Sequence, residues 1–294
     1  MVHRGLRPAS GSLCAVRGGL AAMVSVLALS GCGFYVQELV EPEDLLNEPR
    51  LRYETLDLSP NLLAERMRSI DEHYAEPRTP AKVEYSLETC LASVSRQNEF
   101  GALWRASRAC AWLAENHPSK SEQRRYAKLG AKFGREAVIK VANRVETFYY
   151  LGLCEKALIA RDGLHSSGLL EDAEHNLKIA IALDRSFDHC GSDRALGELL
   201  LETVPYPLLN ATSETGQAGV RAALEHLEKA VETCPDYGEN HLVYARGLMD
   251  ARKYGAARLE LDRVMALAPP PDRSNEHLDW LEQANELLVD LQGK

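Results

Sequence analysis

Two stretches of the chain, residues 219–235 and 253–269, repeat one pattern 34 positions apart. They read GVRAALEHLEKAVETCP and KYGAARLELDRVMALAP. The matching pairs are Ala223 with Ala257, Leu227 with Leu261, Ala230 with Val264, and Pro235 with Pro269. Because the apolar positions recur at helical spacing and a proline follows, each stretch predicts an amphipathic helix. Helical units that repeat at this period cannot bury their apolar faces alone, so they stack into a solenoid.

The pattern resembles the second helix of the tetratricopeptide repeat (TPR). Leu151-Gly152 and Leu196-Gly197 resemble the leucine–glycine pair of its first helix, where glycine lets the two helices approach closely. We therefore predict an all-α fold, a TPR-like α-solenoid of stacked helix hairpins with irregular inserts and a C-terminal capping helix. Such stacks usually form binding surfaces rather than catalytic sites.

Periodicity and start signals predict the other helices. Ser59-Pro60 and Thr79-Pro80 each combine an N-cap residue with a proline at the first helical position. A last amphipathic helix is expected over residues 272–292, with Leu278, Leu281, Ala284, Leu288 and Leu291 facing inward. The helices expected between these cover residues 60–75, 80–95, 98–116, 119–143, 145–161, from 168 onward, 238–251 and 254–267.

Two predicted units are longer than a standard repeat. Gly152 precedes Ala173 by 21 residues and Gly197 precedes Ala223 by 26, where a TPR separates these positions by about 12. We therefore expect inserts of about nine and fourteen residues between the two helices of these units. The second insert contains residues 204–219, whose Pro, Gly, Ser and Thr content predicts a loop. Long inserts in a solenoid lie on one face, which is often the functional one.

The N-terminus predicts secretion and lipid attachment. Three arginines precede an apolar run over residues 20–32, which is short for a membrane span. The run ends in Leu-Ser-Gly-Cys, which resembles the bacterial lipobox and implies cleavage before Cys32 and lipidation of that cysteine. An ordinary signal peptide or an anchor helix is the alternative. Gly33 follows the cysteine, which by resemblance to sorted lipoproteins favours the outer membrane.

The expected domains are a lipoprotein signal peptide at residues 1–31, a lipidated tether at 32–58 and a TPR-like helical domain at 59–294. Residues 1–31 hold three arginines and no acidic residue, so their removal changes the formal net charge from −9 to −12. An acidic body without a basic patch argues against nucleic acid as a partner. Attachment to the membrane would then come from acyl chains.

Five cysteines remain beyond the signal and the lipidation site: Cys90, Cys110, Cys154, Cys190 and Cys234. Without a CxxC motif or a dense framework, they are interpreted mainly as small apolar residues at helix contacts. A periplasmic location permits disulfides. If one bond forms, Cys154–Cys190 is the pair we expect.

A wider resemblance narrows the family. The pieces that carry it are Arg194-Ala195-Leu196-Gly197, Pro205-Tyr206-Pro207 and the stretch PDYGENHL at 235–242. Over roughly residues 82–290 the order of helices resembles the T-component of TPR-associated TRAP transporters, the TatT-like periplasmic lipoproteins. Cys190-Gly191 stands where members commonly have a glycine pair, and Arg185 where they have proline.

This resemblance implies a lipid-anchored accessory subunit on the periplasmic face of the bacterial envelope. Its implied partner is the periplasmic solute-binding protein of a TRAP-type uptake system, with a homotrimeric assembly and a small hydrophobic or carboxylate-bearing ligand. The alternative is a TPR scaffold lipoprotein for outer-membrane or pilus assembly. No cofactor is implied.

In a TPR stack the first helix of each unit lines the concave face. Arginines there can bind carboxylates by paired hydrogen bonds, and aromatic residues often dominate protein recognition. Pairing of each arginine with a neighbouring glutamate is the alternative. Tyr206, between two prolines, would suit a partner contact or a trimer interface, or would pack back onto the helices. The groove residues that counting selects are Trp104, Arg108, Tyr149, Leu153, Arg194, Glu198, Leu242 and Arg246.

Enzymatic interpretations are poor. The chain has no HExxH, GxSxG, Walker or GxGxxG motif. His189-Cys190 lies near two aspartates, but no second cluster at ligand spacing supports a metal site. We therefore expect an interaction protein without catalytic residues or metal.

Overall fold

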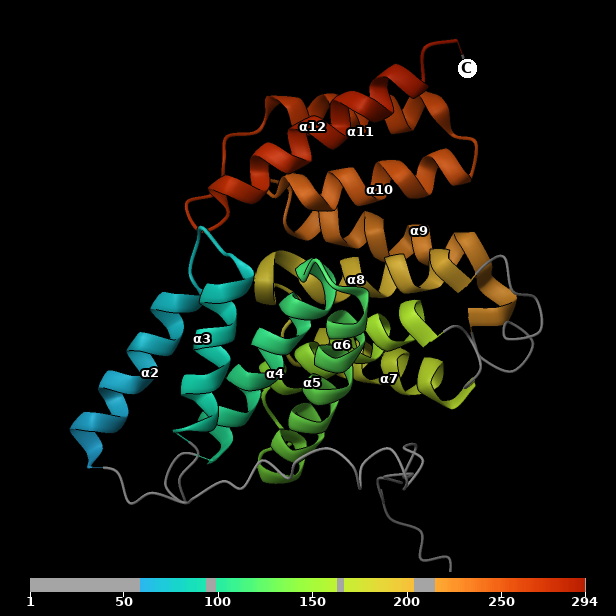
Figure 1. Cartoon of the computed structure of the whole chain (residues 1–294). Helices are drawn as coiled ribbons and strands as arrows, with labels where there is room; N and C mark the ends of the chain where they lie inside the picture. The colour runs from blue at the N-terminus through green and yellow to red at the C-terminus, as the bar shows by residue number, and fades with distance from the viewer. Residues whose placement is uncertain (1–58, 94–98, 163–166, 204–214, 294) are drawn as a thin grey trace, which may run out of the picture. The chain divides into compact units, whose positions relative to one another are not determined.

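The computed structural model describes residues 59–93, 99–162, 167–203 and 215–293, which all belong to one compact unit, 39–294. These residues form eleven α-helices and no strand, as the all-α prediction requires (Figure 1). The signal peptide at 1–31, the tether at 32–58 with Cys32, and Tyr206 lie outside the described residues. The helices are α2 Pro60–Tyr74, α3 Pro80–Leu91, α4 Glu99–Asn116, α5 Lys120–Lys140, α6 Val145–Asp162, α7 Ser167–Leu183, α8 Phe187–Thr203, α9 Thr215–Thr233, α10 Gly238–Asp250, α11 Tyr254–Ala266 and α12 Ser274–Asp290.

The predicted start signals are present. The Ser59 hydroxyl accepts a hydrogen bond from the Leu62 N–H at 3.4 Å, and Pro60 is the first residue of α2. The Thr79 hydroxyl does the same for the Lys82 N–H, with Pro80 opening α3. Each side chain satisfies an N–H group that the helix itself leaves unpaired.

The helices pack in two layers. Consecutive helices contact each other along the chain, and the even-numbered helices also contact one another in the order α2, α4, α6, α8, α10, α12. Among the described helices no two odd-numbered ones make such contacts. The even-numbered helices therefore form an inner layer, and the odd-numbered helices lie outside it.

Glycine allows the two layers to approach closely in the middle units. A Cβ atom on Gly152 of α6 would lie 2.8 Å from Leu177 Cγ of α7. A Cβ on Gly197 of α8 would lie 2.5 Å from Leu227 Cγ of α9. Both distances are shorter than real carbon contacts, so the leucine–glycine pairs have the predicted role.

Two clusters of buried apolar side chains make up the core. The first runs from α2 to α9, and the second from α9 to α12. Helix α9 joins them, because Ala223 belongs to the first cluster and Leu224 to the second. None of the described helices is long and apolar enough to cross a membrane.

Three expectations about local structure are wrong in detail. The first insert mainly lengthens helices, since α6 and α7 have 18 and 17 residues against 13 each in α10 and α11. Part of the predicted loop at 204–219 is helical, because α9 begins at Thr215 and is interrupted at Gly219, whose φ is 49°. Leu278 is 63% exposed, whereas Trp280 fills the inner position of α12 by packing edge-on against Tyr237 at 4.9 Å.

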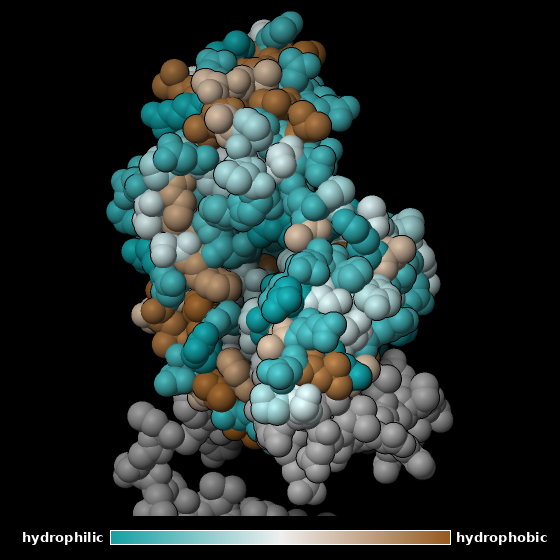
Figure 2. Space-filling model, turned by 90° about the vertical axis from the view of Figure 1, so that its left-hand side faces the viewer, coloured by the Kyte–Doolittle hydropathy of each residue, from teal (hydrophilic) through white to brown (hydrophobic). Residues whose placement is uncertain are grey.

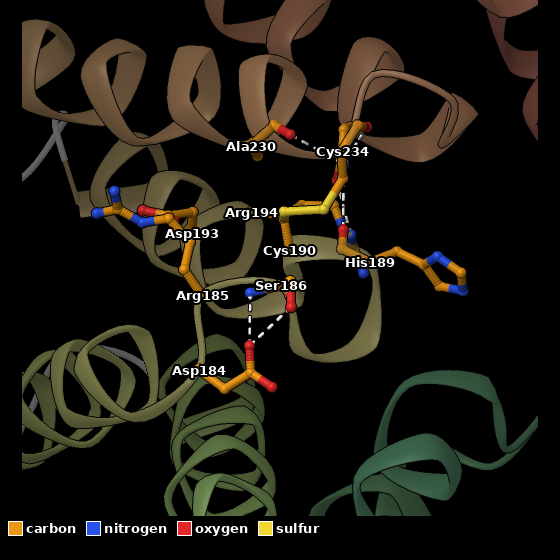
Figure 3. The surroundings of a disulfide bond; sticks show 10 residues. Asp184, Arg185, Ser186, His189, Cys190, Asp193, Arg194, Ala230 and Cys234 are labelled. Carbon is orange, nitrogen blue, oxygen red and sulfur yellow. Dashed lines mark hydrogen bonds and ion pairs between the residues drawn. A yellow bond between two sulfur atoms is a disulfide. The ribbon is translucent and has the colours of Figure 1, made fainter.

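The disulfide is Cys190–Cys234, with Cα atoms 6.1 Å apart, and the expected Cys154–Cys190 bond is wrong (Figure 3). Cys154 on α6 is fully buried, and its Sγ contacts the Ser107 carbonyl on α4 at 3.6 Å. Cys90, Cys110 and Cys154 are free and buried, as the interpretation of helix-contact cysteines predicts.

Candidate functional site

A cavity of about 680 Å³ opens on the inner layer. Its walls come from the C-terminal end of α2 and the α2–α3 loop, from α4, from the first turns of α6 and α8, and from the α11–α12 loop. Its volume is in the range of small-molecule sites. Segments about 200 residues apart in the sequence therefore surround one space.

Arg108 dominates the α4 wall. Its guanidinium lies 4.0 Å from the centroid of the Tyr74 ring and 5.2 Å from that of Trp104. Its Nη2 donates to Asp71 Oδ1 at 2.7 Å, and Arg105 Nε donates to the same oxygen at 3.0 Å. Burial alone would raise the pKa of Asp71, but hydrogen bonds and charge from the two arginines lower it.

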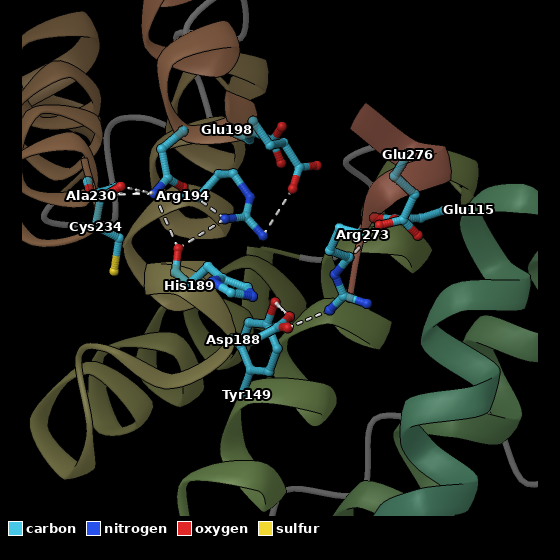
Figure 4. Close-up of polar contacts among 12 residues, drawn as sticks. Glu115, Tyr149, Asp188, His189, Arg194, Glu198, Ala230, Cys234, Arg273 and Glu276 are labelled. Carbon is cyan, nitrogen blue, oxygen red and sulfur yellow. Dashed lines mark hydrogen bonds and ion pairs between the residues drawn. The ribbon is translucent and has the colours of Figure 1, made fainter. Parts of the chain in front are cut away.

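Asp188 dominates the opposite wall. Arg273 Nη2 donates to its Oδ1 at 2.5 Å, and the Tyr149 hydroxyl donates to its Oδ2 at 2.7 Å (Figure 4). Burial would raise the pKa of this carboxyl, but the charges of Arg273 and Arg194 and the Tyr149 hydrogen bond lower it. Asp188 therefore ties the start of α8 to α6 and to the α11–α12 loop.

The backbone at the start of α8 is left-handed at three successive residues. Asp188, His189 and Cys190 have φ of 48°, 55° and 63°, which is costly for residues with a Cβ atom. Cys190 is fixed by its disulfide to Cys234, and the His189 ring stacks on Tyr237 with centroids 4.2 Å apart. These contacts hold the turn that presents Asp188 and His189 to the cavity.

A clasp, made by Glu76, Arg78 and Glu276, joins the α2–α3 loop to α12. The Glu76 carboxylate accepts from the Asn275 N–H at 2.9 Å and from the Glu276 N–H at 3.4 Å. Helix α12 has no capping side chain of its own at Arg273, so Glu76 serves as the cap and its charge favours this helix end. Arg78 Nη2 pairs with Glu276 at 2.7 Å.

Two predicted groove residues, Trp104 and Arg108, line the cavity. The Trp104 ring lies nearly parallel to that of Tyr150, with centroids 6.1 Å apart. The structure thus brings these two side chains together on the inner layer, and their role in binding stays a prediction.

Tyr149 and Leu242 were expected in the groove, and this placement is wrong. Tyr149 is 2% exposed because its ring packs between Tyr150 and Phe187. Leu242 is 1% exposed and belongs to the C-terminal core cluster. Leu153 is half-buried against the first core cluster and does not line the cavity.

Arg194 is also not at the surface, since it is 7% exposed. Its Nη1 donates to Asn240 Oδ1 at 2.7 Å and its Nη2 pairs with Glu239 at 3.1 Å (Figure 4). Its guanidinium lies 5.1 Å from the Tyr237 ring centroid. Arg194 therefore joins α8 to α10. This agrees with the alternative interpretation of the groove arginines, in which each arginine pairs with a neighbouring glutamate.

Glu198 and Arg246 lie apart from the cavity. Glu198 accepts a hydrogen bond from the buried Lys156 of α6. Burial alone would lower the pKa of Lys156, but the charges of Glu198 and Glu115 raise it. Arg246 is exposed and donates to Gln283 of α12. These contacts connect neighbouring inner helices.

The sequence prediction missed Arg78, Asp188 and Arg273 of the cavity. Arg78 stands between Pro77 and Thr79-Pro80, and Arg273 follows three prolines and an aspartate. Proline-flanked arginines in two short loops are the signal that could have found them, because prolines hold a loop in a restricted conformation.

Figure 2 shows one face of the molecule, on which hydrophilic residues predominate around a central hollow, and apolar residues lie toward the upper end and along the lower left side. At the α11–α12 end of the chain, Leu259, Met265, Leu278 and Val289 are exposed. These four residues do not line the cavity.

Comparison with known proteins supports the fold. A crystal structure of TTC0263, a thermophilic TPR protein of Thermus thermophilus, superposes with a TM-score of 0.56 at 16% sequence identity. The match covers 77% of this chain and 99% of that protein. The fold is thus TPR-like. No family model matches the sequence, and no curated protein matches it.

Proposed function

We propose that the chain is a lipid-anchored protein of the bacterial envelope that binds a periplasmic solute-binding protein as the TatT-like accessory subunit of a TRAP-type uptake system. The observation that carries the interaction role is the cavity on the inner layer, where arginine and aromatic side chains from five segments converge. TPR-like solenoids use this layer to bind partners. Arginine and aromatic residues often supply most of the binding energy.

The Cys190–Cys234 disulfide supports a location outside the cytoplasm, because disulfides persist in oxidising compartments such as the periplasm. Lipid attachment at Cys32 rests on the lipobox resemblance. It is tested by palmitate labelling of cells that express the chain, with Cys32→Ser as the variant that should lose the label.

The partner is tested by photo-cross-linking in the native envelope. A photoreactive amino acid replaces Trp104, which lines the cavity, and in a control it replaces Ile139, which is 71% exposed on the outer helix α5. We expect a periplasmic solute-binding protein to be captured from position 104 and not from position 139.

Recovery of only β-barrel or secretin components would contradict the proposal and favour the scaffold alternative. The assembly is tested separately by light scattering of the lipidated chain in detergent. A trimer supports the TatT-like architecture, and a strict monomer counts against it.

A further inference from the structure

One outer helix carries a charge opposite to that of the chain. Helix α5 contains seven basic and two acidic residues, so its formal net charge is +5, whereas that of the chain is −9. Among the described helices α5 alone has a net positive charge, and α12, with five acidic and no basic residues, is the most acidic. These two helices do not contact each other. Positive charge is therefore concentrated on one helix of an otherwise acidic body.

The basic side chains of α5 lie mainly on its outward face. Five residues follow one another at intervals of three or four positions, so they share one face of the helix. They are Arg124, Lys128, Lys132, Arg135 and Ile139. Arg124, Lys132 and Ile139 are exposed to solvent. This basic face thus ends in an isoleucine that is 71% exposed.

Ion pairs within the chain neutralise only part of the charge on α5. Arg125 pairs with Glu122 at 2.7 Å, and Arg135 pairs with the buried Glu155 of α6 at 2.8 Å. Because the helix has two acidic residues to seven basic ones, pairing along α5 cannot cancel its excess of positive charge. The outward face therefore remains electropositive.

The opposite face of α5 packs closely on the inner layer. A Cβ atom on Gly130 would lie 2.7 Å from Cys110 Cβ of α4, and the Ser107 hydroxyl of α4 donates to the Gly130 carbonyl at 3.0 Å. A Cβ atom on Gly134 would lie 2.8 Å from Leu151 Cβ of α6. The basic face therefore belongs to a well-anchored helix of 21 residues, which is about 30 Å long.

We propose that the outward face of α5 docks on an anionic lipid bilayer, with its basic side chains at the lipid phosphates and Ile139 in the headgroup layer. Anionic headgroups attract clustered lysine and arginine, and stable attachment commonly combines an acyl chain with a polybasic surface. The exposed isoleucine on the same face adds the apolar contact that interfacial helices use. This proposal rests on the proposed function, because lipidation at Cys32 would hold the chain close to the bilayer.

Docking through α5 would also orient the cavity. Helix α4 contacts α5 through Ser107, whereas Trp104 and Arg108 of the same helix line the cavity. The cavity and α5 thus lie on different sides of α4, so a partner can reach the cavity while α5 faces the lipid. The acidic helix α12 would be repelled by the same anionic surface, which favours this one orientation.

The first test locates α5 relative to the bilayer. A fluorescent dye is attached at Ile139→Cys, and in a matched control at Leu259→Cys, because Leu259 is 63% exposed on the outer helix α11. The free cysteines of the described chain are buried, so the dye reacts at the new position. The lipidated chain is reconstituted into vesicles of phosphatidylcholine alone or with about 30% phosphatidylglycerol, and a quencher is attached to the lipid tails.

We expect the dye at position 139 to be quenched at least about twofold more strongly in the anionic vesicles than in the neutral ones, and the dye at position 259 to be quenched equally in both. At about 1 M salt, where the Debye length is about 3 Å, the difference at position 139 should disappear. Equal quenching at position 139 in both kinds of vesicle would overturn the proposal. So would capture of an acidic protein from position 139 in the native envelope without quenching by lipid, because α5 would then bind a protein.

The second test removes charge from the basic face. The α5 variant combines Arg124→Gln, Lys128→Gln and Lys132→Gln. The matched control combines Arg221→Gln, Lys229→Gln and Lys253→Gln, which are exposed residues outside α5. Each basic residue near an anionic surface contributes about fivefold to binding, so the α5 variant should lower the docking equilibrium constant about a hundredfold. Equal loss in both variants, or unchanged docking of an α5 variant that melts like the wild type, would refute the role of this face.

The two proposals fail separately. If palmitate labels the chain but the dye at position 139 is not quenched, docking through α5 alone is wrong. If the chain takes up no palmitate yet binds anionic vesicles through α5, the docking surface stands and the lipid anchor of the proposed function is wrong.

Discussion

Arg108 and Arg194 are held in similar surroundings, yet only Arg108 faces the cavity. Each lies over a tyrosine ring, at 4.0 Å from the Tyr74 centroid and 5.1 Å from that of Tyr237. Each pairs with a carboxylate, at 2.7 Å and 3.1 Å. Arg194 makes further hydrogen bonds to Asn240 and to the His189 carbonyl, whereas Arg108 keeps an unpaired Nε–H.

The difference between them is in what encloses the charge. Around Arg194, the disulfide joins the left-handed turn to the α9–α10 corner. This brings Asn240 of α10 next to the guanidinium, which therefore has its hydrogen-bond acceptor within the chain. Around Arg108, the cavity removes the neighbours on one side. Arg194 thus stabilises the junction of two repeats, whereas Arg108 borders the cavity.

The largest expected effect is on the Arg194 side. Replacing both Cys190 and Cys234 by Ser opens a link between residues 44 positions apart, which should lower the free energy of unfolding by about 4 kcal/mol. Urea denaturation measures this. Reducing the wild type with a phosphine should give the same loss and leave the variant unchanged. A loss below about 1 kcal/mol would mean that the turn holds without the bond.

The next largest effect on stability is expected from replacing the two arginines, and it should differ between them. Arg194→Ala leaves Asn240 and Glu239 without their partner in a buried junction, so we expect a loss of about 3 kcal/mol. Arg108→Ala should cost only about 1 kcal/mol, because Asp71 retains Arg105 and is 42% exposed. Urea denaturation measures both losses. Equal losses of unfolding free energy in the two variants would contradict the proposed difference between the two arginines.

A smaller effect is expected for the packing beneath Arg194. Gly197→Ala places a Cβ atom 2.5 Å from Leu227, so α8 and α9 must separate at a cost of about 2 kcal/mol. Gly255→Ala on α11 is the control, since no atom lies within 4 Å of its Cβ and alanine favours helix by up to about 1 kcal/mol. A Gly197→Ala variant as stable as the wild type would contradict the close approach.

The smallest effect concerns pH. The folded-state pKa of Asp188 is lowered, so its contribution to stability is present above the unfolded pKa of about 3.9 and is lost as the pH falls through the folded pKa. The stability difference between wild type and Asp188→Asn should therefore shrink on acidification below about pH 4. Asp71→Asn, at a more exposed pair, should show a weaker trend. Urea denaturation at several pH values measures this. If the free energies of unfolding of wild type and Asp188→Asn differed by the same amount at every pH, the negative charge of Asp188 would not be what stabilises the fold.

Local patterns predicted much of this fold because the forces concerned are local. Ser59 and Thr79 cap the helices that follow them, and Gly152 and Gly197 meet leucines on the next helix of their own unit. The site depends on contacts between distant segments, so only Trp104 and Arg108 were placed correctly by counting within repeats. Counting failed for Arg194 because the neighbours that bury it belong to α10.

The disulfide and the inner face of α12 show the same limit. Spacing in the sequence does not fix which cysteines pair, and here the left-handed turn directs Cys190 toward the α9–α10 corner. Leu278 follows a helical stripe as well as Trp280 does, but it is Trp280 that is buried, with its ring edge-on to Tyr237.

The clasp between Glu76 and α12 also has a consequence for the order of folding. It joins residues 199 and 200 positions apart, whereas most helix contacts join sequence neighbours. Contacts across such separations form late, because the loop they close must first be ordered. Neighbouring repeats can therefore assemble as soon as they are synthesised, while the wall that completes the cavity waits for the last helix of the chain.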